Sequence, residues 1–252
     1  MSDRVDSNPK VYVILNDLQI PWQDKRVLDN LVLPFIEDLQ PDGVILNGDI
    51  VDSYQLSEFT KDPLSKWDLG QEIKEAHQLM DRLEWVEEKI WIGGNHEARL
   101  RKYVWKHAPA LACLPQIQFE TLFGLADHGF KWLPYGKYIR LGKLLVTHGS
   151  LVIKHSAMSA KAHFDKYGCS VLHGHTHRMG SYYITQRGVP SVAYENGCLC
   201  RLDPEYADSP NWQRGFSVVT VFVGSYFNVQ QCPIVNVRGK PTFHYGTERF
   251  AG

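Results

Sequence analysis

Short polar clusters that contain aspartate, asparagine or histidine recur along the 252-residue chain. In order they are Asp17-Leu18-Gln19, Gly48-Asp49, Gly94-Asn95-His96-Glu97, His148-Gly149 and Gly174-His175-Thr176-His177. They offer oxygen and imidazole donors without cysteine, a mixture that suits divalent transition ions such as Mn²⁺, Fe²⁺, Zn²⁺ or Co²⁺. A pair of ions about 3.5–4 Å apart needs about seven ligands and a bridging carboxylate. The clusters contain enough donors for such a pair.

The elements that must position these clusters are strands, because each cluster follows an apolar run. The runs are 11–15, 44–46, 89–92, 144–147 and 170–172. Continuous apolar runs are typical of strands buried on both faces. Helices are predicted between the first three, over about 25–39 and 68–86, with a kink or break at Pro34. This alternation indicates an α/β fold, whose open sheets bind ligands at the carboxyl edge of the strands.

The second half of the chain is richer in strands. A hairpin is predicted over 138–147, and helices over about 97–107 and 156–167. Further strands are expected over 182–185, 191–194, 216–222 and 226–234. No segment is rich enough in Pro, Gly or Ser to serve as a linker, so one domain is predicted over 1–252. It would have a motif core over 11–178 and a β-rich part over 179–252 that completes a second sheet and a substrate wall.

Composition excludes several classes of protein. The formal net charge of −1 gives no general attraction for nucleic acid, although a local basic patch is compatible with it. No apolar run reaches the length of a membrane-spanning helix, and residues 1–10 contain no apolar signal region. The five cysteines lack a paired CxxC spacing, so free thiols in a reducing cytoplasm are expected. Cys198 and Cys200 are interpreted as core residues.

With these motifs in this order, the sequence resembles the calcineurin-like metallophosphoesterase superfamily. The resemblance extends from Asp17 to His177, about two thirds of the chain. It implies a four-layer α/β/β/α sandwich of two mixed sheets flanked by helices. It also implies a pair of divalent metals, with Mn²⁺ favoured and Fe, Zn, Ni or Co as alternatives. The metal-bridging hydroxide would attack a phosphate ester.

The resemblance assigns roles residue by residue. Asp49 would bridge the ions; Asp17, His177 and position 19 would bind the first, and Asn95, His148 and His175 the second. His96 would lie beside the scissile phosphate as a catalytic residue. The departure is Gln19, where the family has histidine, because an amide oxygen is a poorer donor to borderline metals than imidazole.

Several other residues have both a functional and a structural interpretation. Arginines beside the motifs could clamp a phosphate, but a salt bridge or a solvated face is the more common role: Arg99, Arg101 and Arg178. Aromatic residues could stack on a nucleobase, but burial in a core is more common: Tyr54, Phe59, Trp212 and Phe216. Among the histidines outside the motifs, His155 is near enough to His148 in sequence to reach a substrate.

The leading functional prediction is a metal-dependent phosphoesterase. The segments 17–21 and 212–216 resemble those of small phage and bacterial members labelled as phosphoesterases or exonuclease-like. This resemblance favours a phosphodiester substrate, either a nucleotide or nucleic acid. The alternatives are a phosphomonoesterase acting on proteins or nucleotides, and a non-catalytic scaffold of the same fold. Retention of His96 beside the standard ligands counts against the scaffold.

Overall fold

The computed structural model describes residues 8–61, 67–203 and 209–252. Its larger sheet has the strand order β11-β10-β1-β2-β3-β4. The strands are β1 (Lys10–Leu15), β2 (Gly43–Asn47), β3 (Glu88–Ile92), β4 (Lys131–Leu133), β10 (Gly215–Val221) and β11 (Phe227–Pro233). Strands β1 to β4 run parallel, whereas β10 is antiparallel to β1 and to β11. The parallel strands therefore end at one edge, as the alternation of strands and helices predicts.

The second large sheet has the order β5-β6-β7-β9-β8. Its strands are β5 (Tyr138–Leu141), β6 (Leu144–Thr147), β7 (Val171–His173), β8 (Met179–Gln186) and β9 (Val189–Asn196). Strands β6, β7 and β9 are parallel, and β5 and β8 pair antiparallel at the edges. A small third sheet, which the sequence analysis does not predict, contains β12 (Val235–Val237), β13 (Lys240–Tyr245) and β14 (Glu248–Ala251).

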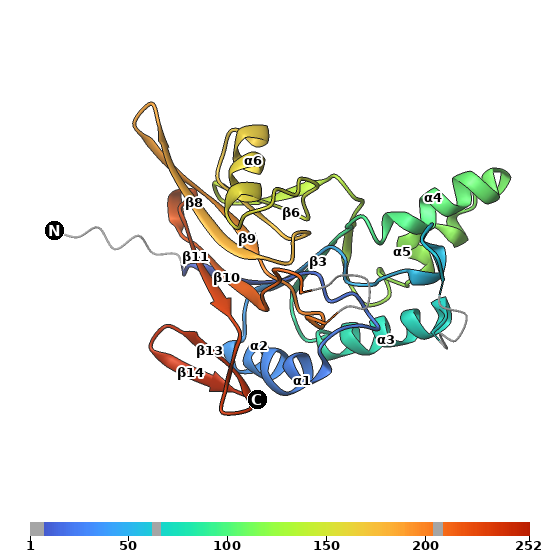
Figure 1. The fold of residues 1–252 in the computed structure, drawn as a ribbon, viewed down its shortest axis with the longest axis horizontal. Helices are drawn as coiled ribbons and strands as arrows, with labels where there is room; N and C mark the ends of the chain where they lie inside the picture. The colour runs from blue at the N-terminus through green and yellow to red at the C-terminus, as the bar shows by residue number, and fades with distance from the viewer. Residues whose placement is uncertain (1–7, 62–66, 204–208) are drawn as a thin grey trace.

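Helices cover the outer faces of the two large sheets (Figure 1). The α-helices are α1 (Lys25–Val27), α2 (Leu33–Leu39), α3 (Leu69–Arg82), α4 (Ala98–His107), α5 (Phe119–Leu122) and α6 (Met158–Tyr167). Short 3₁₀ turns occupy Tyr54–Leu56, Pro109–Leu111, Pro115–Ile117 and Val223–Ser225. A capping box begins α3, where Asp68 accepts a hydrogen bond from the Gln71 amide and Gln71 accepts one from the Asp68 amide.

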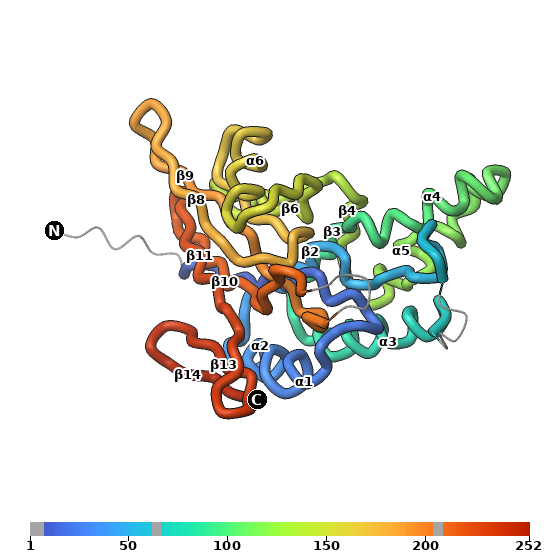
Figure 2. The backbone as a smooth tube through the Cα atoms, in the orientation of Figure 1, coloured from blue at the N-terminus to red at the C-terminus, as the bar shows by residue number. Residues whose placement is uncertain are grey.

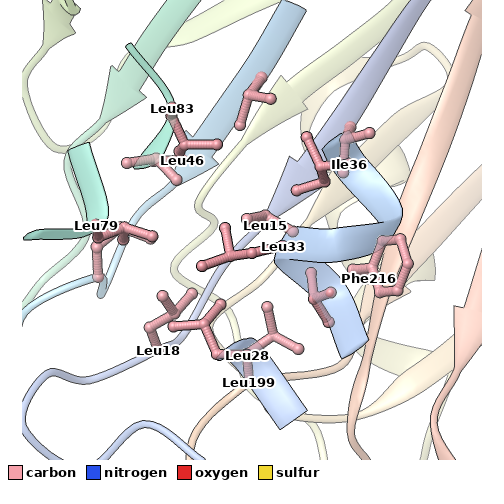
Figure 3. Close-up of a cluster of buried hydrophobic side chains, with 14 of the residues drawn as sticks. Leu15, Leu18, Leu28, Leu33, Ile36, Leu46, Leu79, Leu83, Leu199 and Phe216 are labelled. Carbon is pink, nitrogen blue, oxygen red and sulfur yellow. The ribbon is translucent and has the colours of Figure 1, made fainter. Parts of the chain in front are cut away.

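Side chains along the central strands point alternately to the two faces of the sheet, and each face packs on a different layer. Val13 and Leu15 of β1 pack on the helical side, in a core that includes Leu33 and Ile36 of α2 (Figure 3). Tyr12 and Ile14 point to the other face, where they join side chains of the second sheet such as Val146 and Leu172. On the far side of that sheet, Leu145 and Val171 pack on Phe164 of α6. The predicted four-layer α/β/β/α arrangement of two mixed sheets and flanking helices is confirmed.

The predicted helix over 25–39 forms, but Pro34 does not break it. A π-helical segment, Leu28–Val32, precedes α2, and the Leu33 amide bonds to the carbonyl of Leu28, five residues back. The wider turn lets the chain stay helical where proline lacks an N–H donor. Phe35 in α2 then packs edge-on against Phe243 of β13 and Phe250 of β14, at 5.0 and 4.9 Å between ring centroids. Figure 2 shows β13 and β14 beside α2.

Helix α4 extends away from the sheets, next to α5 (Figures 1 and 2). Within the described ranges no helix has both the length and the apolar character needed to cross a bilayer.

Candidate metal centre

The first group of predicted ligands comes together from two loops, one after β1 and one after β7. Asp17 and His177 are buried, with Asp17 Oδ1 3.1 Å from His177 Nε2. Gln19, also buried, places its Nε2 atom 3.3 Å from the same His177 nitrogen. The carboxylate, the amide and the imidazole thus converge on one point, as the sequence predicts for a first ion.

The second group comes from the ends of β2, β3, β6 and β7. Asp49 Oδ2 lies 3.2 Å from His148 Nε2, and Asn95 Oδ1 lies 3.3 Å from that same nitrogen. Donor atoms of Asp49, His148 and His175 all lie within 4.8 Å of one another. His148 Nδ1 lies 2.9 Å from the carbonyl oxygen of Asn47 in β2, which orients the ring.

Backbone contacts join the two groups. The amide of His175 donates to Asp17 Oδ2 at 2.9 Å, and the amide of Gln19 donates to the Asp49 carbonyl at 2.9 Å. Most of the predicted ligands also adopt a left-handed backbone: φ is 51° at Asp17 and Gln19, 50° at Asp49, 70° at His175 and 55° at His177. Non-glycine residues rarely adopt this conformation, and such outliers cluster at functional sites.

Two glycines are required by the close approach of the loops. A Cβ atom on Gly94 would lie 2.1 Å from Asp49 Oδ1, and one on Gly174 would lie 2.6 Å from Asp17 Oδ2. Such contacts are impossible without displacing the carboxylates. The glycines in these motifs therefore allow the loops after β3 and β7 to reach the acidic side chains.

Glu97 supports the site, a role that was not predicted from the sequence. Its buried carboxylate accepts hydrogen bonds from the backbone amides of Asp49, Ile50 and Gly94, at 2.9, 2.8 and 2.7 Å. It thereby ties the loop after β2 to the loop after β3. Buried backbone donors next to charged groups need such partners, so Glu97 holds the Asp49 backbone in its unusual conformation.

His96 lies at the edge of the second group. Its amide donates to Asp49 Oδ1 at 2.9 Å, and its Nε2 lies 3.7 Å from Asp49 Oδ2. Its Nδ1 lies 2.6 Å from Asp52 Oδ1, and Arg99 donates to the same carboxylate oxygen at 2.9 Å. Of the roles considered for Arg99 from the sequence, a phosphate clamp or a salt bridge or solvated face, the structure shows the salt bridge. Asp52 is a further residue of the site that was not predicted from the sequence.

Burial and neighbouring charges shift the pKa values of the histidines at the site in opposite directions. Burial and the charge of His148 lower the pKa of His175 to about 4, which keeps this ring neutral and able to donate electrons. Burial alone would also lower the pKa of His177, but the charge of Asp17 outweighs it and raises that pKa to about 10. For Asp49, burial opposes ionisation, yet His148 and His96 hold the pKa of this carboxyl well below its usual range.

The residues fit a pair of divalent ions. Asp17 Oδ1 is buried and accepts no hydrogen bond of good geometry from the described residues. A buried carboxylate oxygen in that state needs a positive charge beside it, which the protonated ring of His177 supplies from 3.1 Å and which a bound metal ion would supply in its place. The donors around it are carboxylate, amide and imidazole, the set that Mn²⁺, Fe²⁺ and Zn²⁺ share.

Cys198 and Cys200 are buried, in agreement with their interpretation as core residues, but they also border the site. Cys200 Sγ lies 3.8 Å from His177 Nδ1, on the side of the ring opposite Asp17. Both thiols and His177 lie close enough together to hold an ion, with donor atoms within 4.8 Å of one another. Sequence spacing alone gave no sign of this contact.

The other candidate residues considered from the sequence lie in the core, on the surface or beside the site. Phe216 is buried and Phe59 is exposed, whereas the ring of Trp212 lies 4.2 Å from that of His177. Arg178 is buried and donates to the carbonyl of Lys154 at 2.8 Å, so it has a structural role.

The chain matches known proteins over most of its length. A family model described as calcineurin-like phosphoesterase matches residues 11–179. The gene 54 proteins of Mycobacterium phages D29 and L5 are each 32% identical to this chain in an alignment 249 positions long, and each match covers 91% of this chain and 95% of the phage protein. The crystal structure of Vps29 from Chaetomium thermophilum is 11% identical with a TM-score of 0.42, and the match covers 88% of this chain and 96% of that one.

Proposed function

Because the chain belongs to the calcineurin-like phosphoesterase family, we propose that it hydrolyses phosphodiesters at a centre of two divalent metal ions, with Mn²⁺ as the native metal. Asp17, Gln19 and His177 would hold one ion. Asn95, His148 and His175 would hold the other, and Asp49 would lie between them. The observation that carries this proposal is the pair of donor groups, joined through the His175 amide and the Asp17 carboxylate.

When bound, the two cations polarise the phosphate oxygens and make the attacking water more acidic. The chain itself supplies the proton for the leaving oxygen. Asp52 accepts from Nδ1 of His96 and fixes the ring, so that Nε2 faces the centre beside Asp49. Burial lowers the pKa of His96, but the charges of Asp49 and Asp52 outweigh it and raise the pKa above its ordinary value. A protonated imidazole held in this way can act as the general acid.

The choice of a diester over a monoester rests on the resemblance of segments 17–21 and 212–216 to phage and bacterial members. The second of these segments contributes Trp212, whose ring packs against His177. A monoesterase is the second candidate, because the ligand set is the same for both reactions. The scaffold alternative is disfavoured by the Asp52–His96 contact, which a structural role in binding proteins would not require.

We also propose that residues 1–252 form one domain, with 179–252 completing the second sheet through β8 and β9. The enzyme would act in the cytoplasm. The thiols of all five cysteines are free, as expected of a protein in a reducing compartment.

Hydrolysis of bis-p-nitrophenyl phosphate and of p-nitrophenyl phosphate, measured side by side, tests the proposal. The protein is first treated with chelator and then supplied with Mn²⁺, Zn²⁺ or Ni²⁺. We expect metal-dependent turnover that favours the diester. A preference for the monoester would establish the second candidate, and no turnover of either compound with any metal would support the scaffold.

A further inference from the structure

A groove runs from the wall of the metal centre to the outer part of α4. It has a volume of about 360 Å³ and lies between α4 and the chain from 112 to 135. Volumes of about 300–1,000 Å³ are typical of small-molecule sites. At its inner end, the ring of Tyr135 packs edge-on against that of His148, at 6.4 Å. Glu97, which also borders the groove, binds the Asp49 backbone. The groove therefore adjoins the site, because Glu97 and Tyr135 line the groove and also contact residues of the candidate metal centre.

Aromatic side chains line this groove. Trp105 projects from α4 and is 59% exposed, an unusual position for a large apolar ring. Trp132 lines the opposite wall and is supported by Phe119, which stacks on it at 4.8 Å and 23°. The guanidinium of Arg101 lies 5.0 Å from the centre of the Trp105 ring. Flat rings with a stacked arginine form a surface that binds another π-system.

The charge on α4 complements a phosphate backbone. The helix contains Arg99, Arg101, Lys102 and Lys106 and no acidic residue, although the whole chain carries a net charge of −1. Arg101 and Lys102 are exposed, and Lys106 forms an ion pair with the exposed Glu58, at 2.7 Å. Exposed ion pairs contribute little, so a phosphate can replace Glu58. Among the described residues that line the groove, Glu97 and Glu120 of α5 are acidic.

We propose that the groove beneath α4 binds a base of single-stranded nucleic acid, with the backbone following the basic face of the helix. This inference rests on the proposed phosphodiesterase function, because it places the phosphodiester next to that base at the metal centre. A single strand is favoured over a duplex because stacking on Trp105 and Trp132 requires an unstacked base face. The nearly neutral chain also lacks the extended charge that grips a duplex.

Fluorescence anisotropy of a labelled oligothymidylate, measured in chelator, tests binding without turnover. Loss of one stacked base costs about 1–3 kcal/mol, so Trp105→Ala should weaken binding roughly 5- to 150-fold. Trp105→Phe should retain much of the affinity, because it retains a stacking ring. Arg101→Gln should weaken binding and flatten its salt dependence. The matched control is Trp85→Ala, since Trp85 is 42% exposed, comes after α3 and does not line the groove. That variant should bind like the wild type.

Three outcomes would overturn the inference. In the first, Trp105→Ala and Trp85→Ala bind the oligonucleotide equally well. In the second, the corresponding duplex binds as tightly as the single strand and is unaffected by Trp105→Ala. In the third, the wild type is a dimer that Trp105→Ala dissociates without changing oligonucleotide binding, so that the groove holds a second copy of the chain. Hydrolysis of bis-p-nitrophenyl phosphate by the wild type separately decides the proposed function.

Discussion

Asp52 and His96 form a carboxylate–imidazole pair at the rim of the candidate metal centre, with 2.6 Å between Oδ1 and Nδ1. Asp52 belongs to the loop after β2 and His96 to the loop after β3, so the pair depends on both loops. Arg99 donates to the same Asp52 oxygen and places Nη2 3.2 Å from His96 Nε2. Asp52 therefore fixes the ring at Nδ1, whereas the charge of Arg99 beside Nε2 opposes protonation there and limits how far Asp49 and Asp52 raise the pKa of His96.

Asp52→Asn should lower kcat while leaving the metal content unchanged. The amide can still contact Nδ1, but it removes the charge that helps keep His96 protonated. We expect a loss of about 10- to 100-fold, the usual effect of removing such a supporting partner. The acidic limb of the pH–rate profile should remain, and the alkaline limb should move to lower pH. An unchanged alkaline limb would show that Asp52 does not set the protonation of His96.

His96→Ala should reduce kcat by roughly 10²- to 10⁴-fold, the range for a positioned general acid. The loss should be smaller for p-nitrophenolate leaving groups, which need less protonation, than for alkyl leaving groups. Metal analysis should give the same content as the wild type. His244→Ala, a change of an exposed histidine on β13, is the control and should have no effect. If His96→Ala loses metal, His96 is a ligand and the proposed role is wrong.

Glu72 should make stability depend on pH. Its carboxylate accepts from the amides of Ser53 and Tyr54, at 2.7 and 3.2 Å, just after Asp52. Burial, and then the charge of Asp52, raises the pKa of Glu72 to about 8 from its ordinary value of 4.5. A raised pKa means that the stabilising contribution is complete below about 4.5 and is lost as pH rises through about 8.

The Tm of the metal-free wild type should therefore fall more steeply from pH 5 to pH 8, approximately, than that of Glu72→Gln, which cannot ionise. The substitution can lower Tm at every pH, because an amide cannot accept both backbone bonds. The quantity to compare is therefore the slope of Tm against pH. Parallel curves for the two proteins would show that Glu72 has an ordinary pKa.

Cys200→Ala should weaken the first metal site. The thiol lies behind His177, 3.8 Å from Nδ1, and limits rotation of a ring whose other nitrogen faces Asp17 and Gln19. Partners of this kind typically change metal affinity about 10- to 100-fold. Cys200→Ser should recover part of the affinity. Cys232→Ala, which removes another buried thiol outside the site, should lower Tm without changing metal titration. Equal effects of the two alanine variants on metal affinity would refute the assignment.

The central strands could be predicted from the sequence because each is a continuous apolar run that ends in a polar cluster. The small sheet of β12 to β14 could not, because its stability comes from aromatic packing of Phe243 and Phe250 on Phe35, more than 200 residues earlier in the chain. The kink or break predicted at Pro34 does not occur, and the reason is local. The π-helical segment Leu28–Val32 keeps the chain helical although Pro34 lacks a backbone N–H donor. Such compensation is invisible to a rule that considers proline alone.

The candidate ligands could be identified from the sequence because several short motifs contain the same types of metal-binding residue. The residues that support these ligands could not be identified in this way. Glu97 and Asp52 act through contacts with loops that are distant in sequence. Asp52 lies only three positions after Asp49, yet nothing in the sequence shows that it faces His96 across 44 residues. The left-handed backbone at Asp17 and Asp49 is likewise a consequence of the tertiary structure.

Gln19 provides the sharpest test of the site, since this position departs from the family pattern. Its Nε2 lies 3.3 Å from His177 Nε2, so the amide group reaches the first group through its nitrogen, and binding an ion through Oε1 requires the amide to turn over. An amide oxygen is a weak neutral donor, and the first ion should therefore be the more labile of the two. After chelation, activity should return in two phases as Mn²⁺ is added, with the weaker phase controlling turnover.

Substitutions of Gln19 should affect only the weaker of the two phases in which activity returns on addition of Mn²⁺. Gln19→His should tighten the weaker phase, provided that imidazole fits in the space of the amide, and Gln19→Ala should weaken it further. Neither should alter the stronger phase, because Asn95, His148 and His175 would hold the second ion. A tighter ion need not raise kcat, since it also retains product phosphate more firmly. Calorimetric titration of the three proteins decides: if all bind both ions with the same affinities, Gln19 is not a ligand, and its hydrogen bond to His177 is its whole function.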